Sequence, residues 1–74
     1  MNDLMKKYGW QAIETKIGFD LISRRGIKVA YVQIKKDKYI FYDATNFKLL
    51  SGNKNVVEAA EELLLKYYFA EPLN

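Results

Sequence analysis

A chain of 74 residues without cysteine must hold its fold together by packing alone, because no disulfide can form. So short a chain has room for one domain with a small core. The apolar supply is sufficient, since 50% of the residues are hydrophobic and 15% are aromatic. We therefore expect a single folded domain over residues 1–74.

The composition also bears on where the protein works. Cysteine-free chains are typical of reducing compartments, and the sequence contains neither a recognisable secretory signal nor an apolar run long enough to span a bilayer. We therefore expect a cytoplasmic protein without a membrane partner. Lysine far outnumbers arginine, and Asn, Ile, Tyr and Phe are frequent, which hints at an AT-rich coding sequence from a low-GC bacterium, a phage or another mobile element.

The apolar pattern predicts a helix at the start of the chain, from Asp3 to about Lys16, with Asn2 as its N-cap. Trp10 and two isoleucines fall opposite the apolar face of this helix. Either the helix is buried on two sides, or it breaks near Gly9.

Three extended stretches follow that are rich in β-branched and aromatic residues. They are Phe19–Ser23, Ile27–Ile34 and Tyr39–Ala44. A hairpin turn at Lys36-Asp37 would place Val32 opposite Phe41 on the core side and Tyr31 opposite Tyr42 on the other side. That second side is either exposed to solvent or a partner, or covered by a helix. Phe47–Leu50 is expected to extend this sheet or add to it.

The last element has the strongest helical pattern, from Val56 to about Phe69. Asn55 and Glu58 have the spacing of a capping box, and Pro72 lies just past the end. The expected core face comprises Val56, Ala60, Leu63, Leu64 and Tyr67. The fold class is therefore α+β, a small two-layer α-β-β-β-α domain with an antiparallel three-stranded sheet packed against helices.

The available side chains limit the chemistry. Without histidine and cysteine, the chain cannot build a Ser-His-Asp or Cys-His arrangement or the usual zinc sites. Neither a Walker-type nor a dinucleotide-type glycine motif occurs. We expect a protein that is not an enzyme and that uses no cofactor and no metal.

Glu14, Asp20, Gln33 and Lys35 resemble a degenerate form of the restriction-endonuclease-like PD-(D/E)-x-K superfamily. The resemblance implies that Asp20 is a metal ligand, that Gln33 stands at the position of a glutamate, that Lys35 is the catalytic lysine and that Glu14 is the helical acid. Gln33 is neutral where the family has a carboxylate. A tight turn after the first strand would also place Asp20 opposite Val29, about 13 Å along the strand from Gln33 at about 3.3 Å per residue.

The element order is also similar to that of double-stranded RNA-binding domains, which hold phosphates with lysines at the start of their second helix. Here Lys54 stands alone before that helix and acidic residues such as Glu58 follow it. We therefore do not expect this mode of binding.

Two function classes remain. The first is a non-catalytic module that binds another protein, or itself, through an apolar patch on the outer side of the last helix. Its residues are Leu65 and Phe69, rimmed by Glu61, Glu62 and Lys66. The second is a nucleic-acid-binding domain, including a degenerate nuclease, that uses the basic middle third of a chain of net charge +3. Its candidate contacts are Arg24, Arg25, Lys28, Lys35, Lys36, Lys38, Tyr31 and Tyr42.

Overall fold

The computed structural model describes residues 1–53 and 55–73, so that Lys54 lies outside the described residues. Its elements are α1 (Asn2–Tyr8), β1 (Gln11–Glu14), β2 (Gly18–Ile22), β3 (Lys28–Lys35), β4 (Lys38–Asp43), β5 (Lys48–Gly52) and α2 (Val56–Tyr67). The α+β class is confirmed. The sheet has five strands, however, and the prediction of three was wrong. The element order therefore also differs from that of double-stranded RNA-binding domains.

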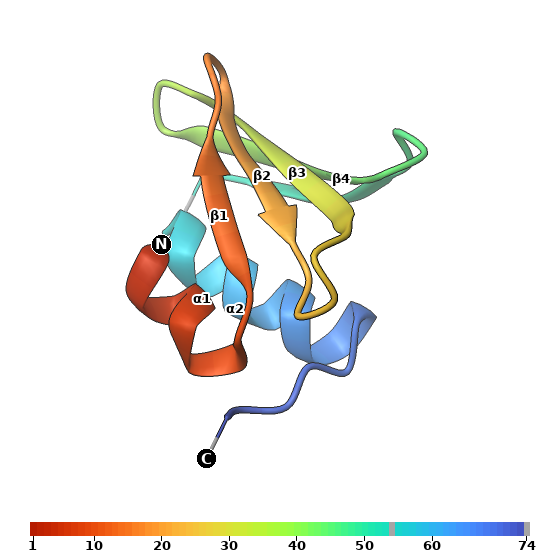
Figure 1. Cartoon of the computed structure of the whole chain (residues 1–74). Coiled ribbons are helices and arrows are strands. Elements are labelled where there is room, and N and C mark those ends of the chain that lie inside the picture. Colours follow the sequence, from red (N-terminus) through yellow and green to blue (C-terminus); the bar gives the residue numbers. More distant parts are fainter. Residues whose placement is uncertain (54, 74) are drawn as a thin grey trace.

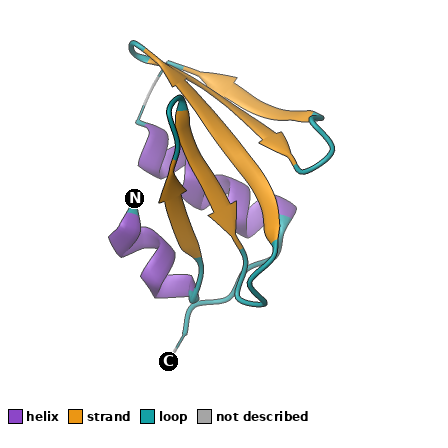
Figure 2. Cartoon of the chain, turned by 45° about the horizontal axis from the view of Figure 1, so that its top comes forward, coloured by secondary structure: helices purple, strands orange, loops and turns teal. Residues whose placement is uncertain are grey.

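The five strands form an antiparallel meander in the order β1-β2-β3-β4-β5. Both helices lie on the same side of this sheet (Figure 1). Their buried side chains join those of β2, β3 and β4 in one core cluster. No described element covers the other side, and Figure 2 turns this side toward the viewer, with the strands in front of α2. We call it the open face.

The predicted long first helix is wrong, and its alternative, a break near Gly9, is confirmed. Gly9 has φ 74°, a left-handed conformation that favours glycine, and its N–H returns to the carbonyls of the last helical turn. The chain then enters β1 instead of continuing the helix. Asn2 is not the N-cap, because Met1 holds that position without a side-chain hydrogen bond.

The register predicted for the central hairpin is confirmed. Val32 pairs with Phe41 and Tyr31 with Tyr42 across β3 and β4. Val32 is 1% exposed and Phe41 is 0% exposed, so the core side was assigned correctly. Lys36 in the turn has φ 58°, the left-handed region that such tight turns need.

The connection between β2 and β3 differs from the tight turn considered above. Asp20 pairs with Tyr31, not with Val29, because the turn spans Ser23 to Ile27 and a bulge follows Leu21. These extra residues shift the register toward the end of β3. Asp20 and Gln33 therefore lie closer together than a tight turn would allow.

The final helix begins as predicted but ends two residues earlier. The Asn55 side chain accepts hydrogen bonds from the N–H groups of Val57 and Glu58 at 2.8 and 3.4 Å, so it is the N-cap. Tyr67, expected in the core, is 44% exposed. Its hydroxyl donates to the carbonyl of Leu49 in edge strand β5 at 3.2 Å, so the side chain reaches the rim of the sheet and not the core beneath it.

Candidate nucleic-acid interface

The open face is organised as rows of side chains that run across the strands, because cross-strand partners point to the same side of a sheet. One row, called here the tyrosine row, contains Ile13, Asp20, Tyr31, Tyr42 and Lys48. The next row toward the β3–β4 turn, called the shallow row, contains Gly18, Gln33, Ile40 and Ser51. Lys35 and Lys38 are paired beyond it.

Tyr31 and Tyr42 stack at the centre of this face. Their ring centroids are 5.1 Å apart and the ring planes differ by 21°. The Lys28 ammonium lies 5.0 Å from the centroid of the Tyr31 ring and 3.3 Å from a carboxylate oxygen of Asp20. Asp20 and Tyr42 flank Tyr31 from its two neighbouring strands, so the Asp20-bound Lys28 lies toward β2 and the Tyr42 ring toward β4.

The Tyr31 hydroxyl is also engaged, since it donates a hydrogen bond to the side-chain oxygen of Asn46. Among the described residues, the outer side of the Tyr42 ring makes no aromatic or cation contact. Its neighbour on that side is Lys48 of β5. The two tyrosines therefore differ: the Tyr31 ring contacts a cation and an aromatic ring, whereas the Tyr42 ring has Tyr31 as its one aromatic or cation contact among the described residues.

Lysines lie on both sides of this aromatic pair along the strands, with Lys28 at the start of β3 and the pair Lys35 and Lys38 next to the β3–β4 turn. Lys35 and Lys38 are exposed and directly opposite one another, a like-charge pairing that disfavours a sheet and that a bound anion would relieve. Together with Lys28 and Lys48 they outnumber Asp20, the one acidic residue of the rows just described. The acidic residues of α2 are Glu58, Glu61 and Glu62, which lie in the helical layer.

The shallow row is low because Gly18 has no side chain and Ser51 has a small one. A Cβ atom at Gly18 would lie 2.0 Å from the Val32 carbonyl oxygen, so β2 approaches β3 too closely for a larger residue. Beside this row, at β5, lies a pocket of about 360 Å³. It is lined by Lys38, Ile40 and Ser51 together with Tyr39, Gly52 and Asn53.

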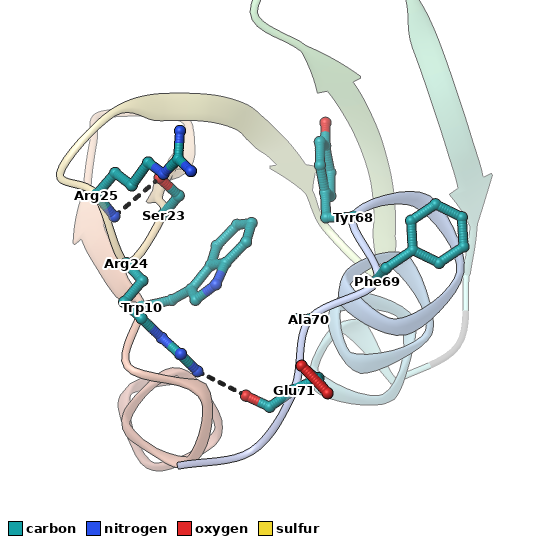
Figure 3. Close-up of a pocket in the computed structure, with 8 residues that line it drawn as sticks. All are labelled: Trp10, Ser23, Arg24, Arg25, Tyr68, Phe69, Ala70 and Glu71. Atoms are coloured by element: carbon teal, nitrogen blue, oxygen red, sulfur yellow. Dashed lines mark hydrogen bonds between the residues drawn. The ribbon is translucent and has the colours of Figure 1, made fainter.

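The structure does not bring all the predicted basic residues together. Arg24 and Arg25 lie in the turn before β3, whereas Lys35, Lys36 and Lys38 lie at the opposite end of that strand. The Arg24 guanidinium donates to the backbone carbonyl oxygen of Tyr8 at 3.3 Å. It also donates to the backbone carbonyl oxygen of Glu71 at 2.8 Å (Figure 3). Arg24 therefore holds the fold together and is not free for a ligand.

The residues behind the nuclease resemblance are also divided. Glu14 lies in strand β1, not in a helix, and pairs with Phe19, which packs against the core. Asp20, Gln33 and Lys35 share the open face, but Lys28 already pairs with Asp20. No group of three histidine, cysteine, aspartate or glutamate side chains among residues 1–53 and 55–73 is arranged to hold a metal ion.

The predicted partner-binding residues lie on or just beyond α2. Leu65 is 46% exposed and Phe69 is 80% exposed. The helix ends at Tyr67, and Phe69 has φ 50°, so Phe69 does not stack one regular helical turn above Leu65. Figure 3 shows its ring pointing away from Trp10.

The acidic rim residues of this patch have partners of their own. Glu61 accepts a hydrogen bond from the buried Tyr8 hydroxyl at 3.0 Å and pairs with Lys7 at 3.4 Å. Burial and then this bond to the carboxylate raise the pKa of Tyr8. Glu62 pairs with Lys66 at 3.7 Å. Glu61 thus ties α2 to α1, whereas Glu62 and Lys66 form an exposed pair.

Sequence reasoning missed Lys48 and the outer members of the shallow row, Gly18 and Ser51; the hairpin register already places Gln33 opposite Ile40. A bulge in the pairing of β4 with β5 sets the side of the sheet on which Lys48 lies, and no residue pattern announces that bulge. Gly18 joins the face because β2 begins one residue before the predicted Phe19–Ser23 strand and pairs with Gln33, and Ser51 joins it through β5. The stacked tyrosines, in contrast, followed from the hairpin register.

Comparison of the chain with family models, with curated proteins and with solved structures gave no match. Neither helix of the described part of the chain has the length and apolar character needed to cross a membrane.

Proposed function

We propose that this protein binds nucleic acid through its open face and does not catalyse a reaction. The observation that carries the proposal is a stacked tyrosine pair, Tyr31 and Tyr42, with lysines at both ends on a sheet surface that no described element covers. Lysines attract phosphates, and aromatic rings offer a surface on which bases stack. The absence of cysteine supports a cytoplasmic location, where nucleic acid is available.

Binding without catalysis is supported by the side chains of this face. The chain has no histidine or cysteine. Gln33 carries no charge, and Asp20 is paired with Lys28 at 3.3 Å. A hard metal ion prefers several charged oxygen ligands, and this face offers one carboxylate that is already engaged.

The test is a salt titration of binding, measured by fluorescence anisotropy with labelled DNA and RNA oligonucleotides. The variant is Lys35→Gln with Lys38→Gln, and the matched control is Lys6→Gln with Lys66→Gln, which removes the same charge from the helical layer. The open-face variant should bind more weakly, and the slope of log K against log salt should fall by about 0.7–0.9 per lost phosphate contact. The control should bind like the parent. Equal loss in both variants, or none in either, would contradict the proposal.

A second candidate function is protein binding or self-association through Leu65 and Phe69. The exposure of these two apolar side chains, 46% and 80%, favours it. The double variant Leu65→Glu, Phe69→Glu should keep its circular dichroism spectrum and shift from dimer to monomer on sizing. A parent protein that is already monomeric and captures no partner from its host would eliminate this candidate.

A further inference from the structure

The geometry points to a single-stranded ligand, one unpaired base of which stacks on the outer side of Tyr42, while Tyr31 serves as the support for that ring. This inference rests on the proposed function and names its substrate class. It commits the open face to a single strand and assigns different roles to two tyrosines that look equivalent in the sequence.

Tyr31 is less suited than Tyr42 to receive a base, because its ring already contacts both Lys28 and Tyr42. The Lys28 ammonium lies 5.0 Å from the ring centroid, toward Asp20 of β2, and the Tyr42 ring centroid lies 5.1 Å away, toward β4. The 3.3 Å pair with Asp20 holds Lys28 in this place, and the hydroxyl bond to Asn46 fixes the ring within its plane. Tyr31 is therefore a positioning residue.

Tyr42 stacks on this ring, and its other side makes no aromatic or cation contact among the described residues. Lys48, its partner on β5, is exposed and lies beside that side of the ring. A base stacked there would bring its phosphate within reach of the Lys48 ammonium. The neighbouring shallow row leaves room for the sugar, because Ser51 is small, and the adjacent pocket opens beside Ile40 and Lys38.

A duplex fits this face less well than a single strand. Tyr31 and Tyr42 are half-buried in the face. The bases of a duplex are stacked on one another and expose only their edges in the grooves, so a tyrosine ring on a sheet surface does not reach their faces. A duplex could touch only the lysines, and it would gain nothing from the aromatic pair. Single strands can turn a base outward onto an aromatic ring.

The experiment compares binding of a labelled (dT)20 strand and of its duplex with (dA)20 to the parent, Tyr42→Leu and Tyr42→Phe. Tyr42→Leu should weaken single-strand binding about 5- to 150-fold, which corresponds to stacking of about 1–3 kcal/mol. It should leave duplex binding unchanged. Tyr42→Phe keeps the ring and should bind like the parent. Single-strand binding that is unchanged in Tyr42→Leu would overturn the inference.

A second measurement uses the unaltered protein and does not depend on how the variants fold. On addition of (dT)20, the ring proton resonances of Tyr42 should move further than those of Tyr31. Equal movement of both rings, or movement of Tyr31 alone, would overturn the inference. If one of these results overturns the inference but the Lys35→Gln, Lys38→Gln variant binds more weakly than the parent, the proposed function stands without the inference. A parent protein that binds neither strand nor duplex would refute the proposed function itself.

Discussion

At the scale of single residues, the core depends on a few large side chains. Phe41 lies at the centre of β4 and is 0% exposed. Its ring packs edge to face against that of Tyr39, with the ring centroids 5.4 Å apart. It pairs with Val32 on one side and Leu50 on the other. Phe47, in the turn after β4, is 67% exposed. These two phenylalanines offer a matched comparison of a buried and an exposed ring.

Phe41→Ala should lower the free energy of unfolding by about 3–5 kcal/mol, because it removes a buried ring and leaves a cavity. A domain of this size has a total stability of only about 4–11 kcal/mol, so this loss is a large fraction of the total. Phe47→Ala should change stability by less than about 0.5 kcal/mol. Urea denaturation measures both values. Similar losses in the two variants would show that the core lies elsewhere.

At the scale of elements, the turn between β4 and β5 is organised by one carboxylate. The Asp43 oxygen Oδ1 accepts from the Thr45 hydroxyl at 2.7 Å, from the Phe47 N–H at 2.9 Å and from the Thr45 N–H at 2.8 Å. These bonds, the one from the Thr45 hydroxyl first, lower the pKa of Asp43. The native turn thus favours the charged form of this side chain.

The depressed pKa predicts how stability depends on pH. Asp43 stabilises the fold fully above the ordinary aspartate pKa of about 3.9, and this contribution disappears as the pH falls through its lower native value. At pH 6, Asp43→Asn should therefore melt below the parent, and the difference in Tm should shrink as the pH falls below about 4. The control is Asp37→Asn, in the exposed turn between β3 and β4. A difference between Asp43→Asn and the parent that does not vary with pH would show that the charge is not what holds the turn.

At the scale of the whole molecule, one arginine joins three parts of the chain that are far apart in sequence. Arg24 lies in the turn between β2 and β3 and binds the carbonyl of Tyr8 at the end of α1 and that of Glu71 in the C-terminal segment. The same segment is held by a bond from the Leu73 N–H to the Lys7 carbonyl at 2.8 Å. The Trp10 and Tyr68 rings pack beside these contacts, with their centroids 5.6 Å apart (Figure 3).

Arg24→Ala should lower the free energy of unfolding by about 1–2 kcal/mol, since two carbonyl groups lose a charged donor. Arg25→Ala removes the same charge from the next position. Its guanidinium makes no hydrogen bond or ion pair within the described residues, and we expect no loss. Hydrogen exchange should also become faster at the Leu73 amide in Arg24→Ala. Equal stability of the two variants would show that the arginine does not hold this segment in place.

The sequence alone determined the central hairpin, because period-two alternation on both sides of Lys36-Asp37 allows only one register that buries Val32 and Phe41. It also determined the start of α2, since the Asn55 side chain satisfies backbone donors locally. Both features depend on residues close together in the chain. From them followed the stacked tyrosines, and with these part of the candidate site.

Only the tertiary structure decided that the sheet has five strands and one open face. Gln11–Glu14 fits a helix or an edge strand equally well, and it became a strand because Gly9 ends α1 and β2 offers unpaired backbone groups. Lys48 reached the open face through a bulge. Whether a helix covers the Tyr31 side depends on where α1 and α2 pack, and both bury their apolar faces against the same side of the sheet. These outcomes arise from contacts between distant residues, which local patterns do not encode.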